Sequence, residues 1–259
     1  MSRRLQGRTA LITGSTSNIG RAIALAFAAE GAHVVVSGRD RGRGADVVAT
    51  IRRAGGRADF VAADLDGSAE RSHRLAEQSR QLLGGRIDIL VNNAGIYPPV
   101  GTASARDADF DRVYGVNVKA AFFLVQAIAP AMIEAGGGVV INLGSWVARV
   151  SVGAGALYAS SKAAMEALTR AWSAEFGTRG IRVNAVSPGV IRDPALDPDT
   201  EFPGEHLMRN TPAGAAGGPD AVAAAAVFLA SGDAAFVHGT VLDVDGGRVS
   251  VAEAIPIPG

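Results

Sequence analysis

A tyrosine and a lysine four residues apart, Tyr158 and Lys162, stand just downstream of an apolar run that ends at Leu143. On a helix this spacing places both side chains on one face, one turn apart. An ammonium beside a phenol stabilises the phenolate, so we expect the pKa of Tyr158 to fall from about 10 toward neutrality. Such a tyrosine can exchange a proton with a substrate oxygen near pH 7. The alternative is an ordinary amphipathic helix that carries a Tyr–Lys pair.

Ser145 lies between the apolar run and this pair, at the carboxyl end of an expected strand over Val139–Leu143. Open α/β sheets bind their ligands at the carboxyl ends of their strands. Lysine occurs only at positions 119 and 162, while arginine supplies every other basic residue. Because a guanidinium does not imitate a compact ammonium, the presence of Lys162 favours a functional role for it.

Composition limits the classes of protein that fit. The 259 residues are 48% hydrophobic and 19% charged, with a formal net charge of zero. This suits one large α/β domain or two small ones, and it gives no electrostatic case for nucleic acid or an anionic membrane. The chain has no cysteine, and its four histidines lack ligand spacing, so we expect no metal site. We see no secretory pattern and no apolar run near the ~20 residues of a membrane span, which predicts a cytoplasmic protein.

Apolar strands alternate with helices along the whole chain. The expected strands are 9–13, 33–37, 59–63, 87–91, 139–143, 181–186 and 240–244, and the expected helices are 19–30, one ending near 55–56, one from about 68, 107–135, 155–176 and 220–230. This alternation predicts a doubly wound parallel sheet of about seven strands, with helices on both faces. No linker divides the chain, so we expect one domain over 1–259, with a mobile substrate lid over about 191–213, where Pro, Gly and Asp are frequent.

A glycine-rich turn, Thr13-Gly14-Ser-Thr-Ser-Asn18-Ile-Gly20, connects the first expected strand to the first helix. Such a turn lets backbone N–H groups and the helix dipole face a pyrophosphate. The alternative is that the glycines merely permit a tight turn, but the position directly after the first strand favours cofactor binding.

Several motifs follow this turn in a fixed order: Asp64, Asn92-Asn93-Ala94-Gly95, Asn117, Ser145, Tyr158/Lys162, Pro188-Gly189 and Val244-Asp245-Gly246-Gly247. Over roughly residues 8–248 the chain resembles the short-chain dehydrogenase/reductase family, in the single-domain branch with 3-oxoacyl-carrier-protein reductases and sugar or polyol dehydrogenases. The resemblance implies a Rossmann-type fold and an NAD(P)-dependent oxidoreductase that interconverts a small ketone and a secondary alcohol.

The resemblance also implies roles for individual residues. Tyr158 would be the general acid/base, Ser145 would polarise the substrate oxygen, Lys162 would hold the nicotinamide ribose, and Asn117 would anchor a water. The implied cofactor contacts are Gly14, Ser15, Ser17, Asn18, Ile19, Gly20, Asp64, Leu65, Asn93, Ala94, Gly95, Tyr158, Lys162, Pro188, Gly189 and Ile191. For Asn92, tying the central strands together is as good an interpretation as contact with the cofactor.

Two residues depart from the family pattern. Asn18 replaces the usual middle glycine of the turn, and asparagine tolerates the left-handed backbone that such a position needs. Asp193 stands where a threonine commonly touches the cofactor, and its carboxylate would repel a pyrophosphate.

The end of the second strand bears on the choice of cofactor. NAD-preferring folds usually place an acid there, but this strand ends in Gly38 and Arg39. Arg39 can bind a 2′-phosphate with its planar fork, so we expect NADP to be favoured over NAD. The alternative is that Arg39 starts a solvated helix capped by Asp40, which could also fold back onto Arg39.

Three functions remain open: a free-standing ketone reductase or alcohol dehydrogenase, a carrier-protein reductase, and a catalytically silent nicotinamide-cofactor sensor. Residues 124–139 contain no Lys or Arg, which disfavours docking of an acidic carrier. The set Asn117, Ser145, Tyr158 and Lys162 disfavours a sensor, because a sensor does not need a proton relay.

We expect a small-molecule substrate, no nucleic acid or membrane partner, and a homotetramer or homodimer. Phe122, Phe123 and Trp172 belong either to its interface or to the core, and Trp146 either walls the substrate pocket or packs in the core.

Overall fold

Seven parallel strands form one sheet in the order β3-β2-β1-β4-β5-β6-β7, within the residues that the computed structural model describes: 3–150, 152–153, 155–197, 202 and 204–252. The strands are β1 (Thr9–Ile12), β2 (His33–Gly38), β3 (Arg57–Ala62), β4 (Ile89–Asn92), β5 (Gly138–Leu143), β6 (Ile181–Pro188) and β7 (Val241–Val244). The doubly wound parallel sheet predicted from the sequence is confirmed.

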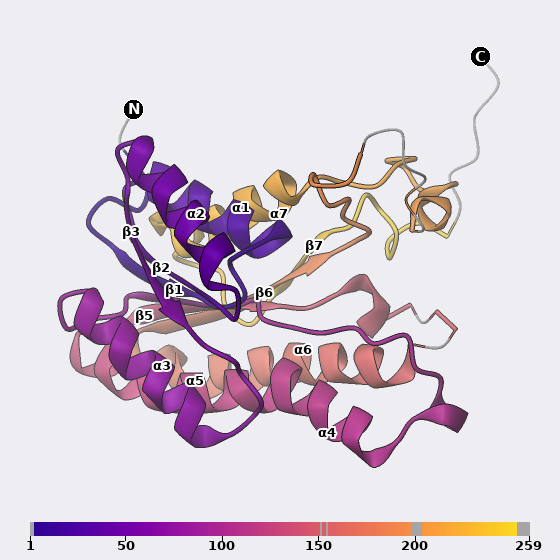
Figure 1. Ribbon diagram of the computed structural model, residues 1–259, viewed down its shortest axis with the longest axis horizontal. Coiled ribbons are helices and arrows are strands. Elements are labelled where there is room, and N and C mark those ends of the chain that lie inside the picture. The colour runs from indigo at the N-terminus through magenta and orange to yellow at the C-terminus, as the bar shows by residue number, and fades with distance from the viewer. Residues whose placement is uncertain (1–2, 151, 154, 198–201, 203, 253–259) are drawn as a thin grey trace.

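Helices cover both faces of this sheet. They are α1 (Asn18–Ala29), α2 (Arg41–Arg53), α3 (Ala69–Leu82), α4 (Asp107–Tyr114), α5 (Ala120–Glu134), α6 (Ala156–Phe176) and α7 (Pro219–Ala230). In Figure 1, α1, α2 and α7 lie on one face of the sheet, and α3, α4, α5 and α6 lie on the other. The chain reverses its winding direction between β1 and β4, and ligands of open sheets bind beyond the carboxyl ends of the strands at such a point.

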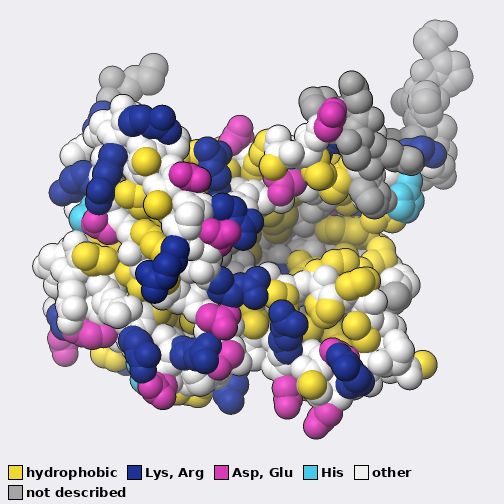
Figure 2. Space-filling model, viewed as in Figure 1, with side chains coloured by type: hydrophobic (Ala, Val, Ile, Leu, Met, Phe, Trp, Pro, Cys, Tyr) yellow, Lys and Arg dark blue, Asp and Glu magenta, His cyan; other side chains and the backbone are white. Residues whose placement is uncertain are grey.

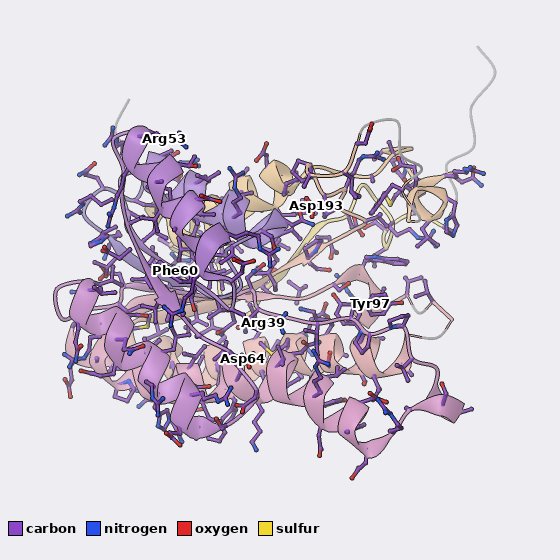
Figure 3. The ribbon with its side chains drawn as sticks, in the orientation of Figure 1. Arg39, Arg53, Phe60, Asp64, Tyr97 and Asp193 are labelled. Atoms are coloured by element: carbon purple, nitrogen blue, oxygen red, sulfur yellow. The ribbon has the colours of Figure 1, made fainter. Side chains whose placement is uncertain are left out.

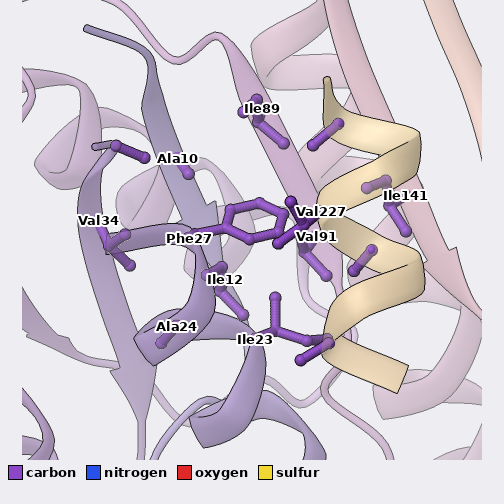
Figure 4. Packing of buried hydrophobic residues seen from close by; sticks show 14 of the residues in the cluster. Ala10, Ile12, Ile23, Ala24, Phe27, Val34, Ile89, Val91, Ile141 and Val227 are labelled. Atoms are coloured by element: carbon purple, nitrogen blue, oxygen red, sulfur yellow. The ribbon is translucent and has the colours of Figure 1, made fainter. Parts of the chain in front are cut away.

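The core consists of one apolar layer on each side of the sheet. On one side, Phe27 and Ile23 of α1 pack with Val227 of α7 against the strands (Figure 4). On the other side, side chains such as Leu75, Leu124 and Trp172 fill the space between the sheet and α3, α5 and α6. Because both faces of the parallel sheet are buried, its strands are almost continuously apolar.

One continuous 28-residue helical run, Asp107–Glu134, is long and apolar enough to cross a membrane by length and composition alone. The run includes charged residues such as Asp111, Arg112 and Lys119, so it is not the uninterrupted apolar stretch of ~20 residues that the sequence was expected to lack. The run packs against α3 and α6, with 44% of its most apolar window buried inside the protein, so its apolar character matches that of a core helix. Between α4 and α5 it widens into a π-helical segment, Gly115–Lys119, that the sequence pattern did not predict.

Candidate active site

The turn between β1 and α1 is held in the left-handed backbone region at two points. Gly14 has φ of 62° and Asn18 has φ of 41°. Asn18 thus adopts the conformation that its residue type was expected to tolerate. Its Oδ1 is buried and has no hydrogen-bond partner among the residues that the structure describes, so it is an unsatisfied acceptor beside the turn.

Asn93, the residue after β4, fastens this turn. Asn93 donates from Nδ2 to the carbonyl oxygens of Thr13 and Gly14, at 2.8 and 2.9 Å. Asn92 instead donates to Asn142 Oδ1 at 2.9 Å, which ties β4 to β5. This hydrogen bond supports the interpretation in which Asn92 ties the central strands together.

Gly20 lies where α1 passes closest to the turn. A Cβ added to Gly20 would stand 2.3 Å from the Gly14 carbonyl oxygen and 2.4 Å from Asn93 Nδ2. We expect Gly20→Ala to lower the free energy of unfolding by about 1–3 kcal/mol, the usual cost of overpacking. Urea denaturation of this variant should be compared with Gly232→Ala, where an added Cβ meets nothing within 4 Å. Equal stability of the two variants would show that the turn relaxes freely.

A cavity of about 680 Å³ opens beside the turn, at the carboxyl ends of β1, β2 and β4. The residues predicted to contact a cofactor that line it are Gly14, Ser17, Asn18, Ile19, Gly20, Arg39, Asp64, Leu65, Asn93, Ala94 and Gly95. Ser15, also predicted to contact a cofactor, does not line the cavity: its side chain is fully buried, and Oγ donates to the Ile12 carbonyl and accepts from Ser37 N. Thr16, Asp111 and Arg112 also line the cavity and were missed, because no local pattern marks them.

Arg39 lies on the wall of this cavity with an exposed side chain (Figure 3). Asp40 caps α2 by accepting from Arg43 N at 3.0 Å, and its other carboxylate oxygen pairs with Arg43 Nε at 2.8 Å. The capping interpretation of Asp40 is confirmed, but the acid folds onto Arg43 rather than onto Arg39. No ion pair or side-chain hydrogen bond engages Arg39 in the part of the chain that the structure describes.

The four catalytic candidates come together at the amino-terminal end of α6. Lys162 Nζ lies 5.6 Å from the centre of the Tyr158 ring and donates to the Leu143 carbonyl at 2.8 Å. Asn117, in the π-helical segment, accepts from Ile96 N at 2.8 Å and donates to Ser161 Oγ at 3.0 Å. A Cβ on Gly95 would stand 3.4 Å from Asn117 Oδ1 and 3.5 Å from Lys162 Nζ, so this cavity-lining glycine adjoins both side chains.

The pKa of Tyr158 moves in the opposite direction from the prediction. Burial raises the pKa of Tyr158, Tyr97 adds to the rise, and a hydrogen bond with the Ser145 side chain opposes it. Lys162 does not lower it, because its ammonium is directed to the Leu143 carbonyl and burial lowers the pKa of Lys162 itself to about 8. At neutral pH the chain therefore holds Tyr158 as a protonated phenol.

Apolar side chains surround the Tyr158 ring. Trp146, with 5% of its surface exposed, forms a cluster with Val147, Val190 and Met208, and Tyr158 packs against this cluster. Trp146 is thus buried, and it also stands beside Tyr158. The Tyr97 ring lies 4.8 Å from the Tyr158 ring, centre to centre, and remains exposed. Figure 2 shows a hollow right of centre, with hydrophobic side chains gathered along its right-hand rim.

An ionic cluster supports the loop that follows Ser145. Arg149 donates to Asp243 of β7 at 2.8 Å and to Ser187 Oγ of β6 at 3.0 Å. Its Nε lies 3.6 Å from the buried Glu166 carboxylate of α6. The loop is therefore braced against the sheet and against the helix that carries Tyr158 and Lys162.

Pro188, Gly189 and Ile191 do not line the 680 Å³ cavity. Gly189 packs closely on the Asp245 backbone, and Ile191 forms a bridge with Gly217. Asp193 Oδ1 accepts from Ala195 N at 3.0 Å and so stabilises a local turn. Residues 198–201 and 203 of the predicted lid lie outside the described residues, and its mobility stays a prediction.

Residues 14–248 match the family model described as enoyl-(acyl carrier protein) reductase. The chain belongs to the short-chain dehydrogenase/reductase family. It is 35% identical, over 95% of its length and 99% of the relative's, to the 3-oxoacyl-[acyl-carrier-protein] reductase FabG of Thermotoga maritima. This confirms the resemblance found in the sequence motifs, and the protein is an oxidoreductase of that family.

Two solved structures of short-chain dehydrogenase/reductase proteins superpose closely on this one. A provisionally assigned NAD(P)-dependent gluconate 5-dehydrogenase of Beutenbergia cavernae, with NADP bound at low occupancy, has a TM-score of 0.88 and 38% identity, covering 97% of this chain and 100% of its own. A 7α-hydroxysteroid dehydrogenase in complex with NADH and 7-oxo-glycochenodeoxycholic acid has a TM-score of 0.89 and 38% identity, covering 96% and 97%. Relatives of this chain therefore include one structure with NADP bound and one with NADH bound.

Proposed function

We propose that this short-chain dehydrogenase/reductase interconverts a small ketone and a secondary alcohol by hydride transfer, with NADP favoured over NAD and Tyr158 as the general acid/base. The observation that carries the proposal is the meeting of Ser145, Tyr158, Lys162 and Asn117 beside a cavity edged by the glycine-rich turn. A half-buried phenol next to a hydroxyl donor and an ammonium suits proton transfer to a carbonyl oxygen.

The cavity fits a dinucleotide in several respects. The closely packed Gly14 and Gly20 leave backbone where a side chain would intrude, so that backbone N–H groups can face a pyrophosphate. Arg39 and Asp64 stand on the same wall, suited to a 2′-phosphate and to the adenine amino group respectively (Figure 3). When bound, the nicotinamide would supply or accept the hydride.

The chain's own residues would handle the proton and the carbonyl. The Ser145 hydroxyl would donate to the substrate oxygen, where negative charge develops during reduction. Tyr158 would give its phenolic proton to that oxygen, and Lys162, whose pKa is lowered by burial to about 8, would help to restore it. The apolar cluster around Trp146 would keep water from the reacting atoms.

The two directions of the reaction should respond oppositely to pH. Reduction needs a protonated Tyr158 and a charged Lys162, so kcat/KM for a ketone should stay level near neutrality and decline above about pH 8, where Lys162 loses its proton. Oxidation needs the Tyr158 phenolate, whose raised pKa makes it scarce at pH 7, so kcat/KM for the alcohol should increase with pH. Steady-state kinetics from pH 6 to pH 10 would measure both trends. A ketone rate that rises with pH would contradict these assignments.

A carrier-protein reductase is the second candidate, because the Thermotoga relative and the family model are both described as carrier-protein reductases. The absence of Lys and Arg from residues 124–139 speaks against carrier docking there. A cofactor sensor would not need four converging catalytic side chains.

We also propose a cytoplasmic homotetramer or homodimer. Phe122 is 44% exposed and suits a subunit interface, whereas Trp172 is buried and fits the core alternative.

A panel of ketones and secondary alcohols tests the proposal. Purified protein would be mixed with each compound and either nicotinamide cofactor, while nicotinamide absorbance is followed. We expect turnover of at least one ketone and of its alcohol, faster with the NADP couple. Activity only on carrier-linked thioesters would favour the second candidate, and cofactor binding without any turnover would favour the sensor.

A further inference from the structure

Arg248 is a cation that has no role in the proposed reaction. It follows the Gly246-Gly247 turn after β7, and its Cζ lies 5.2 Å from the ring centre of Trp146. Trp146 directly follows Ser145 and belongs to the apolar cluster against which Tyr158 packs. A guanidinium over an indole face is held by the charge distribution of the ring, so Trp146 fixes this cation beside the cluster.

Apart from the Trp146 ring, the guanidinium of Arg248 has no partner for its charge among the described residues. Its Nε is buried and has no hydrogen-bond partner, and no acid within the described ranges forms an ion pair with it. The two acids that most closely precede Arg248 in the sequence are engaged elsewhere. Asp243 pairs with Arg149, and Asp245 accepts from the backbone N–H groups of Gly247 and Val249, both at 2.9 Å.

A buried charged donor without an acceptor lowers the stability of the fold unless a ligand supplies the acceptor. Buried donors are nearly always satisfied, and a charged donor without an acceptor carries a larger desolvation penalty than a neutral one. Arg248 remains partly exposed, so an outside ligand can reach it. Arginine donors bind carboxylate and phosphate groups bidentately, which makes an anion the natural acceptor.

We propose that Arg248 anchors an anionic group of the substrate, a carboxylate or a phosphate, while the apolar segment of the same molecule lies on the Trp146 cluster. The substrate class is then a ketone or alcohol with an apolar body and an anionic end, rather than a neutral polyol. The proposal rests on the proposed function only in placing the reacting oxygen at Tyr158.

Calorimetric titration tests this with three probes of equal chain length: octanoate, octyl phosphate and octanamide. We expect the wild type to bind one of the two anions at least ten times more tightly than the amide, and the better of the two identifies the anionic group. Arg248→Met should lose that preference while keeping its affinity for octanamide, and Arg248→Lys should retain part of it. Arg53→Met, at the far end of α2, should behave like the wild type (Figure 3).

Equal binding of the amide and both anions by the wild type would overturn the proposal. Binding of none of the probes, or an undiminished preference in the Arg248→Met variant, would overturn it as well. A neutral ketone turned over through Tyr158, without any preference for anions, would leave the proposed function standing and remove this inference. An anion preference without turnover would support this inference and count against the proposed function.

Discussion

Replacing Tyr158 by phenylalanine is expected to lower turnover by a factor of about 10²–10⁴, the usual contribution of a positioned acid–base group. The variant keeps the ring that packs against the Trp146 cluster and removes only the hydroxyl, so the fold and cofactor affinity should change little. Single-turnover rates, measured where chemistry limits the rate, separate this effect from product release.

Tyr114→Phe is the matched control, because its ring stacks on Phe110 of α4, whereas the ring contact of Tyr158 is with Tyr97. That variant should keep wild-type turnover. If Tyr158→Phe retained more than about a tenth of the wild-type rate, Tyr158 would not be the general acid. A positioned acid–base group contributes at least about a hundredfold to the rate.

Removal of the Arg39 side chain should change the choice of cofactor. A hydrogen bond to a charged group is worth about 1.5–3 kcal/mol, so Arg39 should give NADPH a roughly ten- to hundredfold advantage over NADH. Arg39→Ala should lose that advantage selectively while its kcat/KM for NADH stays near the wild-type value. The absence of an ion pair to Asp40 leaves the guanidinium of Arg39 available for a phosphate.

Arg41→Ala provides the control, because Arg41 starts α2 two residues further on and does not line the cavity. It should leave the ratio of NADPH to NADH activity almost unchanged. Equal losses with both cofactors in Arg39→Ala would place Arg39 in a structural role, and a wild type that prefers NADH would refute the NADP assignment.

The sheet and its helices could be predicted because they follow from local pattern. Short valine-rich segments such as His33–Gly38 favour strands buried on both faces, and glycines end several of the helices between them. The left-handed backbone of Asn18 was also accessible, since it depends on residue type and position.

Features that depend on distant contacts could not be predicted. The Arg149–Asp243 pair joins residues 94 positions apart, and the raised pKa of Tyr158 results from burial that the whole fold creates. Ser15 shows the same limit at short range. It stands in the glycine-rich turn like a cofactor ligand, yet its hydroxyl bonds Ile12 and Ser37.

The position of transferred deuterium tests the central claim most directly, because it records which carbon receives the hydride. NADPH deuterated at C4 would be incubated with the enzyme and a ketone from the panel, and the product analysed by mass spectrometry and NMR. We predict one deuterium on the carbinol carbon of a secondary alcohol, formed by the wild type and strongly reduced in Tyr158→Phe. Deuterium on a carbon of a former double bond, with the carbonyl intact, would contradict carbonyl reduction and indicate an enoyl reductase instead.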